Sequence, residues 1–145
     1  MSVASFKGLK ESDGEVFKAR PAGNYPCRIT DVEEKVSKIK EDGSGGNPYW
    51  NFKAKVLEGN DEEGAVFYFM NSVPYEGMTD EQAQRAVDGM RHIIDACGMK
   101  PTEDVDSSDF ISEELALVVT IGTNKQTGKE QNRVSDQLPM SVIED

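Results

Sequence analysis

The chain has 145 residues and a formal net charge of −11 at pH 7, which is enough length for one domain with its own core. No apolar run approaches the roughly 20 residues of a membrane span, and the first ten residues show no secretory signal. We therefore expect a cytoplasmic protein without membrane contact. Its two cysteines, Cys27 and Cys97, are expected to be reduced core residues.

The negative charge, taken alone, argues against a nucleic-acid ligand, but it is unevenly distributed. Residues 58–64 hold four acids and residues 103–114 hold six, and neither run contains a base. Residues 28–55 carry six bases against five acids, and residues 120–135 carry three bases against one acid. One molecule can therefore present both an acidic side and a local basic groove.

The chain is expected to divide into an N-terminal arm (1–23), a folded domain (24–136) and a short tail (137–145). The arm shows no sustained periodicity, and we expect Phe6 and Phe17 to pin it onto the domain. A cluster of turn residues at the end of the arm marks the start of regular structure.

The first predicted strand runs from about Tyr25 to Val36 and is long enough that a bend or bulge is expected. A glycine-rich loop at residues 37–48 follows and carries Lys38 and Lys40. Its glycines do not fit the G-x-G-x-x-G spacing of a dinucleotide site. We therefore interpret it as a flexible loop that borders the next strand.

The most informative stretch is residues 47–57, where aromatic and apolar residues alternate with polar ones. One side favours a core, and the other carries rings and cations. A sheet that binds nucleic acid needs such a surface, because rings stack on bases and cations contact phosphates. The plainer interpretation is a half-exposed strand with solvated lysines. The core side is Trp50, Phe52, Ala54 and Val56, and the other side is Tyr49, Asn51, Lys53 and Lys55.

A third strand is predicted at residues 65–70, after the acidic turn at 58–64. Phe67 and Phe69 are the expected core residues of this strand. Tyr68 then lies outside, on the same side of the sheet as the lysines of the preceding strand.

The helix signal is the strongest in the chain. Thr79 and Gln82 form a capping box, and an apolar stripe at spacings of three and four continues to Cys97. Gly98 then suits the left-handed residue that ends a helix. His92 lies beside the stripe and is interpreted as a surface or boundary residue, because no nucleophile accompanies it.

After an acidic connector at residues 102–114, two more strands are predicted at 115–121 and 130–136, joined by a turn at 122–128. The turn and the last strand add three bases to the candidate surface. These are Lys125, Lys129 and Arg133.

The sequence contains no motif of an enzyme. The segment from Gly122 to Glu130 differs from a P-loop in spacing, and Glu130 stands where a hydroxyl must hold magnesium. One histidine and two cysteines cannot build a Cys/His zinc site, and the acidic runs lack the calcium-loop pattern. We therefore expect a non-enzymatic protein without a metal or another cofactor.

The predicted order of three strands, one helix and two strands is that of an OB-fold, a five-stranded barrel with its helix between strands 3 and 4. Oligonucleotides bind this fold on strands 2 and 3, between the loops that join strands 1 and 2 and strands 4 and 5. The bases and rings found above fall on these elements, whereas the acidic runs at 58–64 and 103–114 are expected on connectors outside this surface. Trp50 joins the rings if a bulge turns it outward. The candidate site is Lys38, Lys40, Tyr49, Trp50, Asn51, Lys53, Lys55, Tyr68, Lys125, Lys129 and Arg133.

Three segments carry a resemblance to a known family. They are Pro21-Ala22-Gly23-Asn24-Tyr25, the loop end Gly46-Asn47-Pro48 with the strand after it, and Thr127-Gly128-Lys129-Glu130-Gln131-Asn132-Arg133-Val134. Over residues 6–136 the chain resembles small phage proteins that look like OB-fold single-stranded DNA-binding proteins. The resemblance implies sequence-independent binding of single-stranded DNA in phage replication or recombination, in the host cytoplasm, with other phage replication or recombination proteins as partners. The short tail lacks the long acidic end that recruits such partners in many single-stranded binding proteins.

Two alternatives remain open from the residues. A small acidic protein is also compatible with a protein-binding module, or with a DNA mimic that inhibits a host nucleic-acid enzyme through its acidic connectors. A homodimer is compatible with free strand edges. Neither the oligomeric state nor a preference for DNA over RNA can be read from the sequence.

Overall fold

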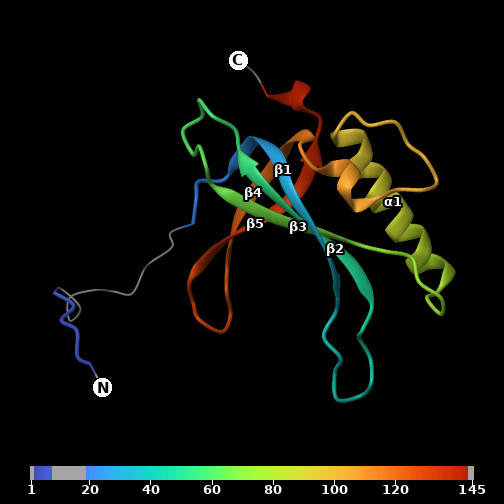
Figure 1. Ribbon diagram of the computed structural model, residues 1–145, viewed down its shortest axis with the longest axis horizontal. Coiled ribbons are helices and arrows are strands. Elements are labelled where there is room, and N and C mark those ends of the chain that lie inside the picture. Colours follow the sequence, from blue (N-terminus) through green and yellow to red (C-terminus); the bar gives the residue numbers. More distant parts are fainter. Residues whose placement is uncertain (1, 8–18, 144–145) are drawn as a thin grey trace.

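The computed structural model describes residues 2–7 and 19–143. The regular structure is one open antiparallel sheet of five strands with one long helix (Figure 1). The mainly β class, the order of the elements and the place of the helix are confirmed; a closed hydrogen-bonded barrel is not. The elements are β1 (Gly23–Val36), β2 (Pro48–Val56), β3 (Val66–Ser72), α1 (Asp80–Ala96), the 3-10 turn η1 (Ser107–Phe110), β4 (Glu114–Thr123), β5 (Glu130–Leu138) and the 3-10 turn η2 (Met140–Val142).

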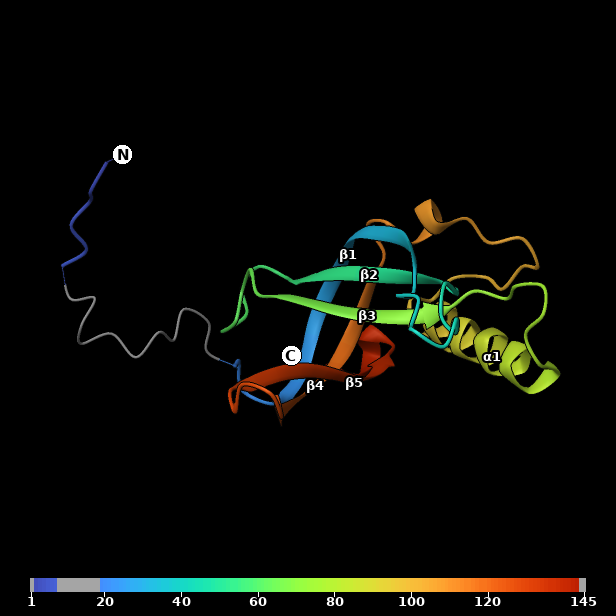
Figure 2. The same ribbon diagram turned by 90° about the horizontal axis from the view of Figure 1, so that it is seen from below.

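The central strand β1 serves two partners, and the sheet order is β3-β2-β1-β4-β5. The first part of β1 pairs with β4 and the second part pairs with β2. The ladder with β2 shifts register between Ile29 and Asp31, which is the expected irregularity in a long strand. In Figure 2, β4 and the first part of β1 run across the direction of β2 and β3.

The core lies on the concave side of this bent sheet. Phe52 of β2 stacks on Phe69 of β3 with ring centroids 4.8 Å apart, and it meets the edge of Phe110 at 5.2 Å. Alternation along β2 and β3 is as predicted, because every second side chain is buried. The inner residues of the remaining elements are also buried: Cys27, Ile29, Ile93, Ile94, Cys97, Leu115, Leu117 and Val119.

Helix α1 begins and ends as predicted. The Thr79 Oγ1 atom accepts a hydrogen bond from the Gln82 amide at 3.1 Å, and the Gln82 side chain accepts from the Thr79 amide at 3.0 Å. Gly98 adopts φ +69°, a left-handed conformation at which an L side chain is strained. The helix therefore has a defined start and stop.

Side-chain contacts of α1 join it to both edge strands of the sheet. Asn71 of β3 donates a hydrogen bond to the Ala86 carbonyl at 3.0 Å. On the opposite edge, His92 Nε2 lies 2.7 Å from Asp136 Oδ1 of β5. His92 is half-exposed, as predicted, and it also connects the helix to β5. One end of the gap between β3 and β5 is thus bridged by α1.

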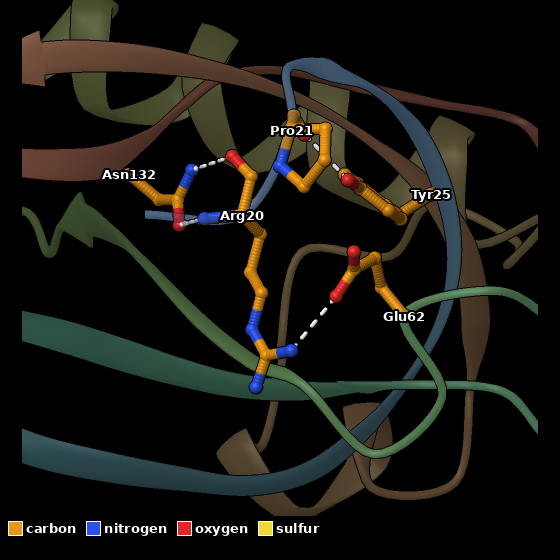
Figure 3. A network of polar contacts seen from close by, with 5 residues as sticks. All are labelled: Arg20, Pro21, Tyr25, Glu62 and Asn132. Atoms are coloured by element: carbon orange, nitrogen blue, oxygen red, sulfur yellow. Dashed lines mark hydrogen bonds and ion pairs between the residues drawn. The ribbon is translucent and has the colours of Figure 1, made fainter. Parts of the chain in front are cut away.

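The other end of that gap is bridged by the segment that enters β1 (Figure 3). The backbone of Arg20 exchanges two hydrogen bonds with the side chain of Asn132 on β5, at 2.7 and 2.8 Å. The guanidinium of Arg20 pairs with Glu62, in the turn between β2 and β3, at 2.8 Å. The Tyr25 hydroxyl donates to the Pro21 carbonyl. We call this set of contacts the Arg20 clasp.

The arm and the tail differ from expectation. Phe6 is 70% exposed, so it does not pin the arm onto the domain, and Phe17 lies outside the described residues. The start of the expected tail belongs to β5, which continues to Leu138. No helix in residues 2–7 and 19–143 is long and apolar enough to cross a membrane.

We predict that Gly89→Ala destabilises the fold, although alanine in a helix interior is more favourable than glycine by about 1 kcal/mol. A β-carbon at Gly89 would lie 2.2 Å from Oδ1 of Asn71, whose amide is held by the Ala86 and Ser72 carbonyls. The expected loss is about 1–3 kcal/mol in urea unfolding. In an Asn71→Ala background the same change should stabilise the chain; destabilisation there would show that Asn71 is not the obstacle.

We predict that neither cysteine reacts in the folded chain. Burial raises the pKa of the Cys27 and Cys97 thiols from 9.0 to about 12. The folded state therefore keeps protons that the unfolded state releases, so the thiol contribution to stability falls as the pH rises from 9 to about 12. An aromatic disulfide reagent at about pH 8 should label both thiols only in urea. Fast labelling without denaturant would contradict the burial.

Candidate functional site

The outer side of β2 carries the predicted row of ring, amide and lysines. Tyr49, Asn51 and Lys53 are half-buried, and Lys55 is exposed. The structure therefore brings these four residues together on one side of one strand.

The neighbouring edge strand β3 adds a row of exposed apolar side chains. Tyr68 is 55% exposed and stands opposite Lys53 in the antiparallel register. Val66 and Met70 flank it on the same side and are also exposed. Tyr68 lies where the sequence places it. Alternation with the buried Phe67 and Phe69 also places Val66 and Met70 on this side, although the predicted site did not include them.

The strand on the other side of β2 carries acids that the sequence analysis did not place there. Asp31 of β1 stands opposite Lys53, and Glu33 stands opposite Asn51. Glu33 is paired with Lys35 at 3.3 Å. Bases on this face are therefore confined mainly to β2, between an acidic row on β1 and an apolar row on β3.

A hollow of about 570 Å³ lies where this face meets the loop between β1 and β2. Lys38, Tyr49 and Met70 line it, together with polar groups at the ends of β2 and β3. The half-buried ring of Tyr49 and the side chain of Lys38 are thus placed around one depression. This size is in the range of pockets that hold small organic groups.

The loop at the rim of this hollow is folded back on itself. Across its base the Ser37 amide donates to the Asn47 carbonyl at 2.8 Å, and the Asn47 amide donates to the Ser37 hydroxyl at 2.9 Å. Gly45 has φ +101°, and a β-carbon there would lie 2.1 Å from the Lys38 carbonyl oxygen. Hydrogen bonds from Ser44 lower the pKa of Asp42, so the loop carries an anion as well as Lys38 and Lys40.

The hairpin that joins β4 and β5 extends to the same side of the molecule as the loop between β1 and β2, toward the bottom of Figure 1. Lys125 and Lys129 are exposed on this hairpin. Arg133 is placed differently: a β-carbon added at Gly122 would lie 2.6 Å from its Nε atom, so its side chain lies against β4. Arg133 is therefore not among the residues of the β2–β3 face.

Two further placements correct the predicted site. Trp50 lies on the core side of β2, half-buried, with its ring 6.3 Å from that of Phe110, so no bulge turns it outward. Lys55 shares a hollow of about 550 Å³ with Glu58 and Glu63. The acidic turn at 58–64 therefore borders the candidate face, whereas it was expected to lie away from it.

The candidate bases differ from most other bases in their pairing. Arg20, Arg28, Lys35, Arg85 and Arg91 each form an ion pair with a carboxylate. Within the described part of the chain, none of the seven candidate bases forms such a pair: Lys38, Lys40, Lys53, Lys55, Lys125, Lys129 and Arg133. Lysine and arginine groups outside ion pairs can form charge-assisted hydrogen bonds with an anionic ligand.

Comparison with known families gives one assignment. Residues 7–143 match the family described as "Protein of unknown function (DUF669)". The chain belongs to the DUF669 family. A comparison with curated proteins finds no match. The description of DUF669 names no ligand and no activity, so its function has to be inferred from the geometry of this surface.

Proposed function

We propose that the chain binds single-stranded DNA without sequence preference, across the outer side of β2 and β3, in phage replication or recombination. The observation that carries the proposal is the cross-strand pair of Lys53 and Tyr68: an exposed ring stands opposite a lysine that forms no ion pair with a described carboxylate. The half-buried Tyr49 lines the neighbouring hollow together with Lys38.

We further propose that the open sheet is a partly closed barrel of the OB type. Its strand order places β3 and β5 at the two edges, and these edges approach each other. Both ends of the gap are bridged, by α1 and by the Arg20 clasp. The β2–β3 face and its two bordering loops correspond to the surface on which this fold binds oligonucleotides.

In the proposed mechanism, bases stack on Tyr68 and Tyr49 at about 1–3 kcal/mol for each base. Every base has a flat face, so stacking does not distinguish sequences. The lysines of β2 and of the two loops contact phosphates. Glu58 and Glu63 share the surroundings of Lys55, and Asp31 stands opposite Lys53, so nearby carboxylates reduce the contribution of both lysines.

The rival hypothesis of a DNA mimic finds less support in the acidic connector. The Asp106 carboxylate accepts hydrogen bonds from the amide and the hydroxyl of Ser108, which lowers its pKa. Asp109 accepts a hydrogen bond from the Asp106 amide at 3.1 Å. These two carboxylates form the capping box of η1, so a local structural role accounts for them.

We predict that a labelled oligo-dT binds the chain, as measured by fluorescence anisotropy, with matched RNA and duplex oligomers as comparisons. If about four lysines contact phosphates, log affinity should fall against log salt with a slope near −3. Trp50 is unsuitable as the reporter, because it lies on the core side of β2. Absence of binding at low salt and tens of micromolar protein, with the chain folded and its mass measured, would refute the proposal.

We predict that Lys53→Ala weakens the binding of oligo-dT and of other single-stranded sequences by the same factor. The slope of log affinity against log salt should become shallower by about 0.7. The control is Lys100→Ala, because Lys100 is exposed and follows α1, outside the β2–β3 face. If Lys53→Ala and Lys100→Ala have equal effects, the site lies elsewhere.

For stacking, Tyr68→Ala should cost about 1–3 kcal/mol of binding free energy, and Tyr68→Phe should retain it.

A further inference from the structure

A second hollow, of about 590 Å³, lies between α1, the end of β3 and the connector after α1. Its lining is largely apolar. Trp50 enters from β2, Val87 and Met90 from α1, and Val105 from the connector. Val87 is 52% exposed, and the other three are half-buried. The core side of Trp50 is therefore not fully covered by the chain itself.

The two segments of chain that form most of this hollow are acidic. Residues 80–96 and 97–113 together carry nine carboxylates and three bases. Arg91, which lines the hollow, is already paired with Asp95 at 2.9 Å. Asp88 and Glu103 also line it, and neither forms an ion pair with a base among the described residues. An apolar depression is thus bordered by carboxylates without basic partners.

We propose that this hollow docks a basic amphipathic segment of a partner protein. An apolar side chain of the segment would pack on Trp50 and Val87, while lysine or arginine side chains would pair with Asp88 and Glu103. This is the mode in which an amphipathic helix lies in a groove. The acidic walls disfavour DNA here, and the net charge of −11 disfavours a second copy of the chain. DNA and partner would then occupy separate surfaces.

The experiment uses the full chain and a synthetic peptide of about 16 residues. Its leucines follow the spacing i, i+3, i+4 and i+7, and its other positions are mainly lysine. Titration should change the fluorescence of Trp50, the one tryptophan, in a saturable way. A peptide with the same composition and scrambled leucines should bind at least about tenfold more weakly.

The decisive variant is Val87→Lys, which places a cation in the apolar wall and should weaken peptide binding at least about tenfold. The matched control is Val66→Lys, on the exposed side of β3, which should bind the peptide as the parent chain does. Oligo-dT binding should be unchanged in Val87→Lys. The peptide titration therefore tests this proposal, and the oligo-dT titration tests the proposed DNA binding independently. Thermal unfolding of both variants checks that they are folded.

Four results would overturn the proposal. They are no saturable change up to about 1 mM peptide, equal binding of the scrambled peptide, equal binding by Val87→Lys, and a dimer that dissociates in Val87→Lys. The last result would assign the hollow to a second copy of the chain.

Discussion

The division of β1 between two partners determines the shape of this molecule. Its first part extends the β4–β5 side of the sheet, and its second part extends the β2–β3 side. The bend between them encloses the core and leaves β3 and β5 facing each other without a hydrogen-bonded ladder. A buried gap of this kind would leave backbone groups without partners. Here the gap is bridged by side chains, from α1 at one end and from the Arg20 clasp at the other.

Local pattern was sufficient to predict much of the fold and part of the site. Alternation along β2 and β3 correctly separated Phe52 and Phe69 from Lys53 and Tyr68, because a strand places successive side chains on opposite sides. The capping box and the glycine at the end of α1 were equally local signals. These features depend on residues no more than a few positions apart.

Features that depend on strand register could not be predicted in the same way. Asp31 stands beside Lys53 only because of the pairing between β1 and β2, which shifts after Ile29. Glu58 and Glu63 line the same hollow as Lys55 because of the path of the turn between β2 and β3, which alternation along a strand does not describe. The pairing of Arg20 with Asn132 joins residues 112 positions apart. Asp31 and Asn132 come from strands far from their partners in the sequence, where the pattern of a single strand carries no information.

The arrangement of charge separates two kinds of surface on one small acidic protein. Among the described residues, most bases that form no ion pair lie on β2 and on two loops that extend to one side (Figure 1), whereas acids outnumber bases in α1 and the connector after it. Because ions screen exposed charges beyond about 8–10 Å, the acids that border the lysines, on β1 and in the turn at 58–64, reduce the positive potential at β2 more strongly than more distant acids do. The apolar hollow beside Trp50 belongs to the acidic side.

The Arg20 clasp also bears on how the protein is made. During synthesis Arg20 leaves the ribosome long before its partner Asn132. Strand β1 likewise cannot complete its pairing until both β2 and β4 have been synthesised. Contacts this distant along the chain slow folding, because loop-closure entropy is lost before they form. The nascent domain therefore holds β1 half-paired until β4 emerges. The two sheet edges can meet only after β5 has followed, so the early β1–β2–β3 hairpins do not set that moment.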